Sequence, residues 1–165
     1  MHLGRTDAGV HSLGQVANFK LENNTLEPQK LGIAINSKLK KSIVIKAVEE
    51  VEERFHSRYN CKSKKYRYVI NNSRSGSSIY RGLEYHMPIK LDVQKMNRAI
   101  KFFEGEHDFS AFKASGTSSK SSVREIYEAR LIEDGERIII ELTGNGFLYN
   151  MVRIISGTLV DVGLR

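Results

Sequence analysis

Residues 122–144 read SVREIYEARLIEDGERIIIELTG, and this stretch predicts a β-hairpin. Two runs rich in β-branched and apolar residues, 123–132 and 137–143, flank the pair Asp134-Gly135. An Asp-Gly pair between such runs is a strong hairpin signal, because both residues tolerate the backbone conformations of a tight turn. The hairpin is the clearest structural signal in the chain, and the segments on either side of it complete the predicted fold.

Helices are predicted before and after the hairpin. Asp92 is a suitable N-cap for a helix over 93–104, and Gly105 follows as a stop signal. Its apolar stripe consists of Val93, Met96, Ile100 and Phe103. A second helix is predicted over 147–161, with a stripe of Leu148, Met151, Ile155 and Leu159 at helical spacing.

Strands dominate the rest of the prediction. We expect strands at 15–21, at 42–51 with both faces buried, and at 62–71, and a helix that begins at Pro28 and runs through QKLGIAINSKL. The class is therefore α+β, with a largely antiparallel sheet flanked by helices. The loop EERFHSRYN, 52–60, separates two expected lobes, 1–53 and 54–165.

The composition favours a polyanionic partner. The 165 residues carry 26 Lys and Arg against 19 Asp and Glu, a net charge of +7. Such a balance is typical of nucleic-acid binding, although it also serves solubility. Cys61 is the single cysteine, which excludes an internal disulfide and fits a reducing cytoplasm. Because no run of about 20 apolar residues and no secretory leader is present, we expect a cytoplasmic protein without a membrane partner.

The loop GRTDAGVH, 4–11, carries the first candidate for chemistry. Small residues after Asp7 let a substrate approach its carboxylate, and the neighbouring Arg5 favours the ionised form that a nucleophile needs. The alternative is a turn aspartate that caps its own backbone, and the loop alone does not decide between the two.

The segment KSKKYRYVI, 62–70, carries the second candidate. On a strand, Tyr66 and Tyr68 point to one face, where they can stack on bases, while Lys65 and Arg67 are placed to meet phosphates. The alternative is a tyrosine pair in the core under a solvated basic edge.

Two later segments carry weaker candidates. Arg153 in GNGFLYNMVRII, 144–155, sits on an otherwise apolar helix and needs an anionic partner, unless it snorkels to a polar face. Lys113 in HDFSAFKASG, 107–116, belongs either to an RNA-facing loop or to a surface loop pinned by Phe109 and Phe112.

The sequence favours neither a metal site nor a cofactor site. Its five histidines lack metal-ligand spacing, and no glycine-rich phosphate-binding loop ends in Lys-Ser or Lys-Thr. We therefore expect no cofactor and no metal.

Taken together, four motifs closely resemble the tRNA pseudouridine synthase A family and occur in that family's order. They are GRTDAGVHSLGQVANF, KKYRYVI, HDFSAFKASG with SSVREI, and GNGFLYNMVRIISGTLVDVG. The resemblance implies the pseudouridine synthase fold, with two lobes around a cleft that meets the tRNA anticodon stem-loop. It implies an isomerase that converts uridine to pseudouridine.

The resemblance also implies roles for single residues. Asp7 matches the catalytic aspartate, Tyr66 the active-site tyrosine that stacks on the target base, and Arg153 the arginine that pairs with the aspartate. Arg5 resembles the residue that fills the gap left by the flipped-out base, and Leu148 an apolar residue that lines the pocket.

The family has sections before the Asp7 loop and after the Arg153 helix that this sequence lacks. We therefore expect an internal fragment with weak or no activity, whose exposed sheet edge and apolar face pair with a second copy as a homodimer or edge-paired homo-oligomer. Two alternatives stay open: an RNA-binding module without catalysis, and an aspartate-dependent glycosidic hydrolase, which needs a second carboxylate.

Overall fold

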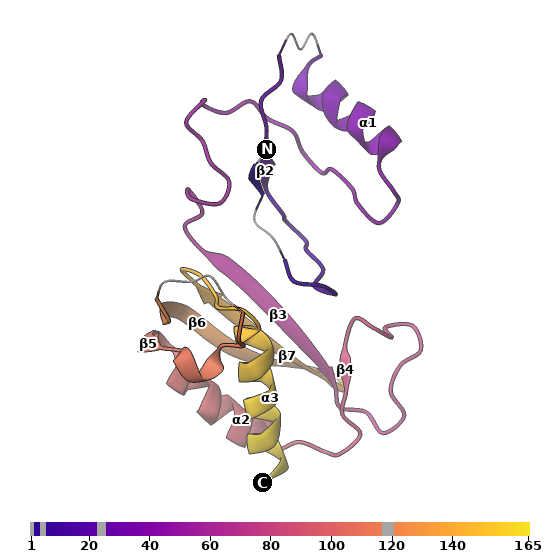
Figure 1. The fold of residues 1–165 in the computed structure, drawn as a ribbon. Helices are drawn as coiled ribbons and strands as arrows, with labels where there is room; N and C mark the ends of the chain where they lie inside the picture. The colour runs from indigo at the N-terminus through magenta and orange to yellow at the C-terminus, as the bar shows by residue number, and fades with distance from the viewer. Residues whose placement is uncertain (1, 4–5, 23–25, 117–120) are drawn as a thin grey trace. The chain divides into compact units, whose positions relative to one another are not determined.

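A computed structural model describes residues 2–3, 6–22, 26–116 and 121–165. By its internal contacts the chain divides into two compact units, unit 1 from Met1 to Cys61 and unit 2 from Lys62 to Arg165 (Figure 1). No helix in the described part of the chain is long and apolar enough to cross a membrane.

The described residues of unit 1 form one helix and one short strand pair. The helix α1, Pro28–Lys38, begins with Pro28 in its first turn, as predicted, because proline has no N–H to leave unpaired there. The strands β1, His2–Leu3, and β2, Ala17–Asn18, pair antiparallel, so the strand predicted at 15–21 is limited to two residues.

The strand predicted at 42–51 is wrong. The chain is irregular there, and the side-chain amide of Asn36 takes the place of a neighbouring strand: the Ile45 N–H donates to its Oδ1 at 2.7 Å, and its Nδ2 donates to the Ile45 carbonyl at 2.9 Å. Ile45 and Val48 pack on the helix at Gly32, whereas Ile43 and Val44 are exposed, so the two faces of this segment are not buried as predicted. A Cβ at buried Gly32 would lie 3.3 Å from Val48 Cγ2, so helix and loop are in close contact.

Unit 2 is built on a five-stranded sheet in the order β4-β3-β7-β6-β5. Its strands are β3 Lys64–Asn71, β4 Tyr85–His86, β5 Gly105–Asp108, β6 Val123–Asp134 and β7 Arg137–Gly144. All neighbours are antiparallel except β3 and β4. This confirms the α+β class, the strand predicted at 62–71 and the predicted hairpin. The short strands β4 and β5 were not predicted from the sequence.

The hairpin has a tight end and an irregular end. At the tight end Asp134 pairs with Arg137, and Gly135 adopts a left-handed φ of 60°, which its lack of a side chain allows. At the other end Ile126 is opposite Gly144 but Glu128 is opposite Thr143, so β6 holds one extra residue in a β-bulge.

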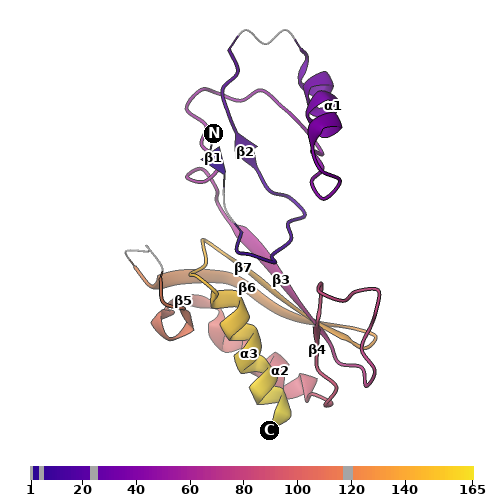
Figure 2. The ribbon, with the colours of Figure 1, turned by 45° about the vertical axis from the view of Figure 1, so that its right-hand side comes forward.

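Two helices cover one face of this sheet, α2 at Val93–Ile100 and α3 at Met151–Leu164 (Figure 2). A 3₁₀ turn, Lys101–Phe103, extends α2 over most of the predicted 93–104, and the Asp92 carboxylate accepts from the Lys95 N–H at 3.0 Å, as expected of an N-cap. The helix α3 begins four residues later than predicted, after Asn150 in a left-handed conformation.

The helices and the sheet enclose the core of unit 2. The predicted apolar stripes are confirmed, because Met96, Ile100, Met151, Ile155 and Leu159 are fully buried. The two helices contact each other closely at Gly163, where a Cβ would lie 2.8 Å from Met96 Sδ.

Candidate active site

Asp7 occupies an exposed tight turn in unit 1. The turn is closed by the backbone, since the Val10 N–H donates to the Asp7 carbonyl at 3.1 Å, and Gly9 has a left-handed φ of 74°. Within the described residues no hydrogen bond or ion pair involves the Asp7 carboxylate. The alternative role as a self-capping turn residue therefore lacks support. Arg5, expected beside it, lies outside the described residues.

Tyr66 and Tyr68 project from β3 toward the face that carries the helices, and both are half-buried. The Tyr66 ring contacts the Phe147 ring edge to face, with 5.0 Å between centroids. Phe147 precedes α3, so this contact holds the Tyr66 ring between its strand and the start of the helix.

Tyr68 lies at a pocket that we call the tyrosine pocket. It lies between β3, β4 and α3, has a volume of about 260 Å³, and is lined by Tyr68, Tyr85, Met87, Arg153, Ser156, Gly157, Val160, Asp161 and Leu164. Burial raises the pKa of the Tyr68 hydroxyl, and the charge of Arg153 partly offsets this. The structure thus brings predicted residues Tyr68 and Arg153 together, while Tyr66 does not line this pocket.

Arg153 lies in the first turn of α3 and is exposed. Asp7 belongs to unit 1, whereas Tyr66 and Arg153 belong to unit 2. The pairing of Arg153 with Asp7 therefore stays a prediction.

Lys65 and Arg67 project from the opposite face of β3 and bind a carboxylate that the sequence analysis missed. Glu141 of β7 is 5% exposed, accepts from Arg67 Nη2 at 2.7 Å, and lies 3.7 Å from Lys65 Nζ. The hydrogen bond from Arg67 holds the pKa of Glu141 below its usual value, against the effect of burial. Their predicted role in binding phosphate therefore competes with an existing partner.

The remaining predicted residues lie in the second half of the chain. Leu148 is 5% exposed and belongs to the hydrophobic core. Lys113 is half-buried just after the 3₁₀ turn Ser110–Phe112. Phe109 and Phe112 contact each other at 6.1 Å between centroids, which supports the interpretation of this segment as a loop pinned by aromatics.

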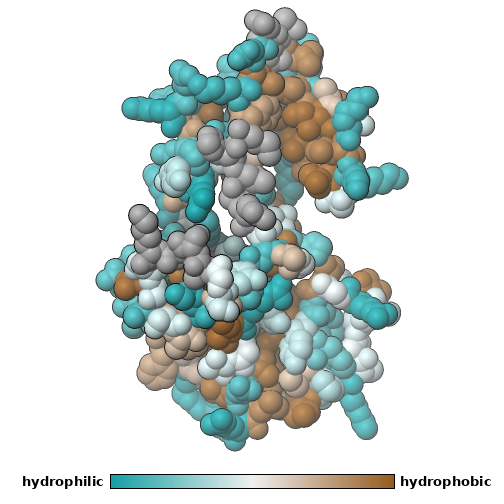
Figure 3. Space-filling model, in the orientation of Figure 1, coloured by the Kyte–Doolittle hydropathy of each residue, from teal (hydrophilic) through white to brown (hydrophobic). Residues whose placement is uncertain are grey.

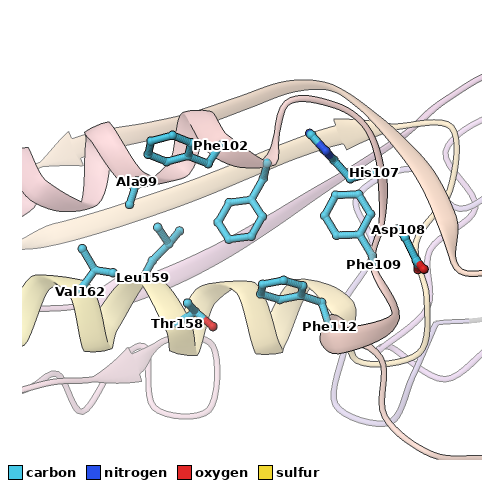
Figure 4. A pocket seen from close by; sticks show the side chains of 10 residues that line it. Ala99, Phe102, His107, Asp108, Phe109, Phe112, Thr158, Leu159 and Val162 are labelled. Atoms are coloured by element: carbon cyan, nitrogen blue, oxygen red, sulfur yellow. The ribbon is translucent and has the colours of Figure 1, made fainter.

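The same aromatics line a larger pocket of about 440 Å³ (Figure 4). Its wall is apolar, formed mainly by Phe102, Phe103, Phe109 and Phe112 with Leu159 of α3. His107 and Asp108 stand at one end of it, so it offers few polar groups to orient a reacting molecule.

Comparison with known proteins identifies one family. The sequence profile of the family described as tRNA pseudouridine synthase matches residues 3–60 and 99–165. A protein of Acetivibrio thermocellus named tRNA pseudouridine synthase A is 49% identical over 160 residues, which are 97% of this chain and 65% of that protein. One of Ruminiclostridium cellulolyticum with the same name is 51% identical over 161 residues, again 97% of this chain and 65% of the relative. The chain thus spans 65% of the length of these relatives.

Proposed function

Because the chain belongs to the tRNA pseudouridine synthase family, we propose that this protein isomerises uridine to pseudouridine in tRNA. The observation that carries the proposal is the family match, which includes Asp7 in the range 3–60 and Arg153 in the range 99–165. The exposed Asp7 carboxylate, unpaired within the described residues, adds support because such a group is available to a substrate.

The proposed reaction conserves all atoms of the RNA. The bond between base N1 and ribose C1′ breaks, and C5 of the same base bonds to C1′. C5 loses its proton and N1 gains one. We assign Asp7 as the nucleophile that forms a covalent intermediate and later leaves, which splits one difficult step into two easier ones.

Tyr66 and Arg153 are the proposed partners of Asp7. Tyr66 stacks on the target base and helps to remove the C5 proton, a role supported by the edge-to-face contact that orients its ring on Phe147. Arg153 pairs with the Asp7 carboxylate and favours its ionised form.

The substrate we propose is the anticodon stem-loop of tRNA, bound in the cytoplasm. Extruding a base from the stack costs a few kcal/mol, and we assign Arg5 to fill the gap and Leu148 to line the apolar side of the site. The net charge of +7 favours phosphate binding, with Lys113 and Tyr68 as further contacts. Lys65 and Arg67 bind phosphate only through the N–H groups that are not already bound to Glu141.

A homodimer or edge-paired homo-oligomer is the quaternary state we propose. Figure 3 shows apolar side chains gathered over α1 in unit 1. Among the described residues of that unit only Gly32 is buried, and several large apolar side chains are more than half exposed: Leu13, Val16, Ile33, Ile43 and Val44. Covering this surface with a second copy would remove it from water.

A tritium-release assay tests the function, because isomerisation frees the hydrogen at C5 of uridine. The substrate is a tRNA transcript labelled at uridine C5. The enzyme is assayed as the 165-residue chain and as a chimera in which this chain replaces the matched part of the Acetivibrio thermocellus relative. We expect the chimera to release tritium with one pseudouridine formed per tritium. A chimera that binds tRNA without releasing tritium would favour an RNA-binding module and contradict the proposal.

A further inference from the structure

The tyrosine pocket combines two aromatic rings from neighbouring strands. Tyr68 comes from β3 and Tyr85 from β4, which pair in parallel with Tyr85 opposite Ile70. Tyr85 is 46% exposed and Tyr68 is half-buried, so both rings leave surface accessible. Two rings at one pocket are typical of sites that stack on nucleic-acid bases.

The helix side of the pocket supplies one positive and one negative group. Arg153 and Asp161 both line it from α3, and eight residues along a helix correspond to about 12 Å, so they mark its two ends. Within the described part of the chain the Asp161 carboxylate takes part in no hydrogen bond or ion pair. The Ser156 hydroxyl, by contrast, is committed to the Val152 carbonyl at 2.8 Å.

The size of the pocket limits what it can hold. Sites that enclose a whole small ligand usually measure about 300–1,000 Å³. The tyrosine pocket measures about 260 Å³ and its rings are partly exposed, so it suits one flat base whose sugar and phosphate stay outside. Such a base stays at the pocket mainly because the rest of its RNA is bound to the protein.

The groups at the pocket are within electrostatic reach of one another. Burial is the main cause that raises the pKa of Tyr68, the charge of Arg153 lowers it, and Tyr85 raises it. The Tyr68 hydroxyl is therefore protonated at neutral pH and able to donate a hydrogen bond.

We infer that the tyrosine pocket binds a nucleobase of the RNA next to the target uridine, with Tyr68 and Tyr85 as its stacking surface and Asp161 as acceptor for N–H groups at the base edge. The inference rests on the proposed function, because it takes tRNA as the ligand. Tyr66, which we place on the target base, lies two residues before Tyr68 on the same face of β3, about 6.7 Å away. The pocket is thus distinct from the position assigned to the target.

The experiment is a mutant cycle between protein and RNA. Binding of the 165-residue chain is measured by fluorescence anisotropy with three RNAs: an intact anticodon stem-loop, and two versions with one abasic nucleotide on the 5′ or the 3′ side of the target uridine. The proteins are wild type, Tyr85→Ala, Tyr85→Phe and Tyr127→Ala. Tyr127 is a matched control because it is 49% exposed on β6 and does not line the pocket.

We expect one abasic RNA to bind wild type about tenfold more weakly than the intact RNA, which is the loss of one base stack. Tyr85→Ala should bind the intact RNA about tenfold more weakly and should not distinguish it from that abasic RNA. Tyr85→Phe and Tyr127→Ala should behave as wild type. A further variant, Asp161→Asn, is measured with stem-loops that carry each of the four bases at that position, and it should change which base is preferred without abolishing binding.

Several results would overturn the inference. It would be contradicted if wild type bound all three RNAs equally well, or if wild type bound no RNA. It would also be contradicted if Tyr85→Ala distinguished the abasic RNAs from the intact RNA as strongly as wild type does, or if free cytidine monophosphate bound wild type as tightly as the intact RNA. Thermal unfolding of each variant shows whether a loss reflects folding. The outcomes separate this inference from the proposed function: RNA binding that depends on Tyr85 without tritium release contradicts only the function, and tritium release unaffected by Tyr85→Ala contradicts only the pocket.

Discussion

Arg67 and Glu141 are direct partners across the β3-β7 ladder, and Arg67 Nη2 lies 2.7 Å from Glu141 Oε1. Arg130 is the partner of Glu141 on the other side, in β6, with Nη2 3.1 Å from Oε2. One buried carboxylate on the central strand therefore connects three strands through half-exposed cations. This arrangement holds β3 in the register that sends Tyr66 and Tyr68 to the opposite face.

Replacing Glu141 with Gln should lower the free energy of unfolding by about 2 kcal/mol, since the amide has no charge and only one acceptor oxygen for the two arginines at this buried position. Urea unfolding followed by circular dichroism measures the change. Glu128→Gln is the matched control: its side chain is 44% exposed and binds Arg130 at 3.2 Å, so its loss should cost about 0.5 kcal/mol or less. Equal effects of the two substitutions would contradict a special role for Glu141.

Glu141 should also contribute to acid unfolding. Its pKa in the folded protein is lowered, chiefly by the hydrogen bond from Arg67, below the ordinary value of 4.5. The unfolded chain therefore binds the proton more readily, and the stabilisation is present above pH 4.5 and is lost as the pH falls through the folded pKa. Unfolding free energies of wild type and Glu141→Gln, measured from pH 7 to pH 3, should converge on the acid side. A constant difference would show that the charge of Glu141 contributes nothing.

Two glycines of α3 should respond oppositely to alanine. At Gly163 the new Cβ would meet Met96 Sδ at 2.8 Å and Leu91 Cβ at 3.2 Å, so overpacking should destabilise the protein by about 1–2 kcal/mol. At Gly157 no atom lies within 4 Å of the new Cβ, and helix propensity should stabilise it by up to about 1 kcal/mol. Thermal unfolding of the two variants compares them within one helix. A stabilised Gly163→Ala variant would mean that α2 and α3 can move apart at no cost.

Asp7→Asn should abolish tritium release by the chimera while tRNA affinity stays within a few-fold, because in the proposed mechanism the carboxylate acts on the reacting nucleoside and few phosphate contacts depend on it. Single-turnover release and filter binding on the same preparations measure both. Asp134→Asn, in the exposed hairpin turn, is the control and should retain both. A parallel loss of binding and activity in Asp7→Asn would assign this residue to RNA binding instead of chemistry.

The sequence predicted those elements whose signals are local. The Asp134-Gly135 turn, the Asp92 cap and the two helical stripes each depend on residues close in the chain, and the structure confirms them. The segment 42–51 has strong β propensity, but a strand also needs a neighbour, and here the Asn36 side chain pairs with Ile45 instead.

The candidate site was predictable only in part, for a related reason. Its motifs identify Asp7, Tyr66, Tyr68 and Arg153, because each stands out within a few residues. Tyr85, Asp161 and Glu141 are ordinary in their local sequence. Strand pairing and helix packing bring them to their positions, Tyr85 and Asp161 at the tyrosine pocket and Glu141 beside Arg67.

Side chains alternate between the two faces of a regular strand, and the bulge in β6 shifts this alternation by one residue. Ile126, Ala129 and Leu131 all face the core although the first two are three residues apart, and this is possible because Tyr127 is inserted without a partner on β7. Deleting Tyr127 would restore an unbroken ladder and turn residues 123–126 to the wrong faces, taking Ile126 out of the core. Gly144 on β7 cannot take a side chain in its present position, because a Cβ there would lie 2.5 Å from the Glu125 carbonyl oxygen. The end of the hairpin away from its turn therefore has a fixed residue count.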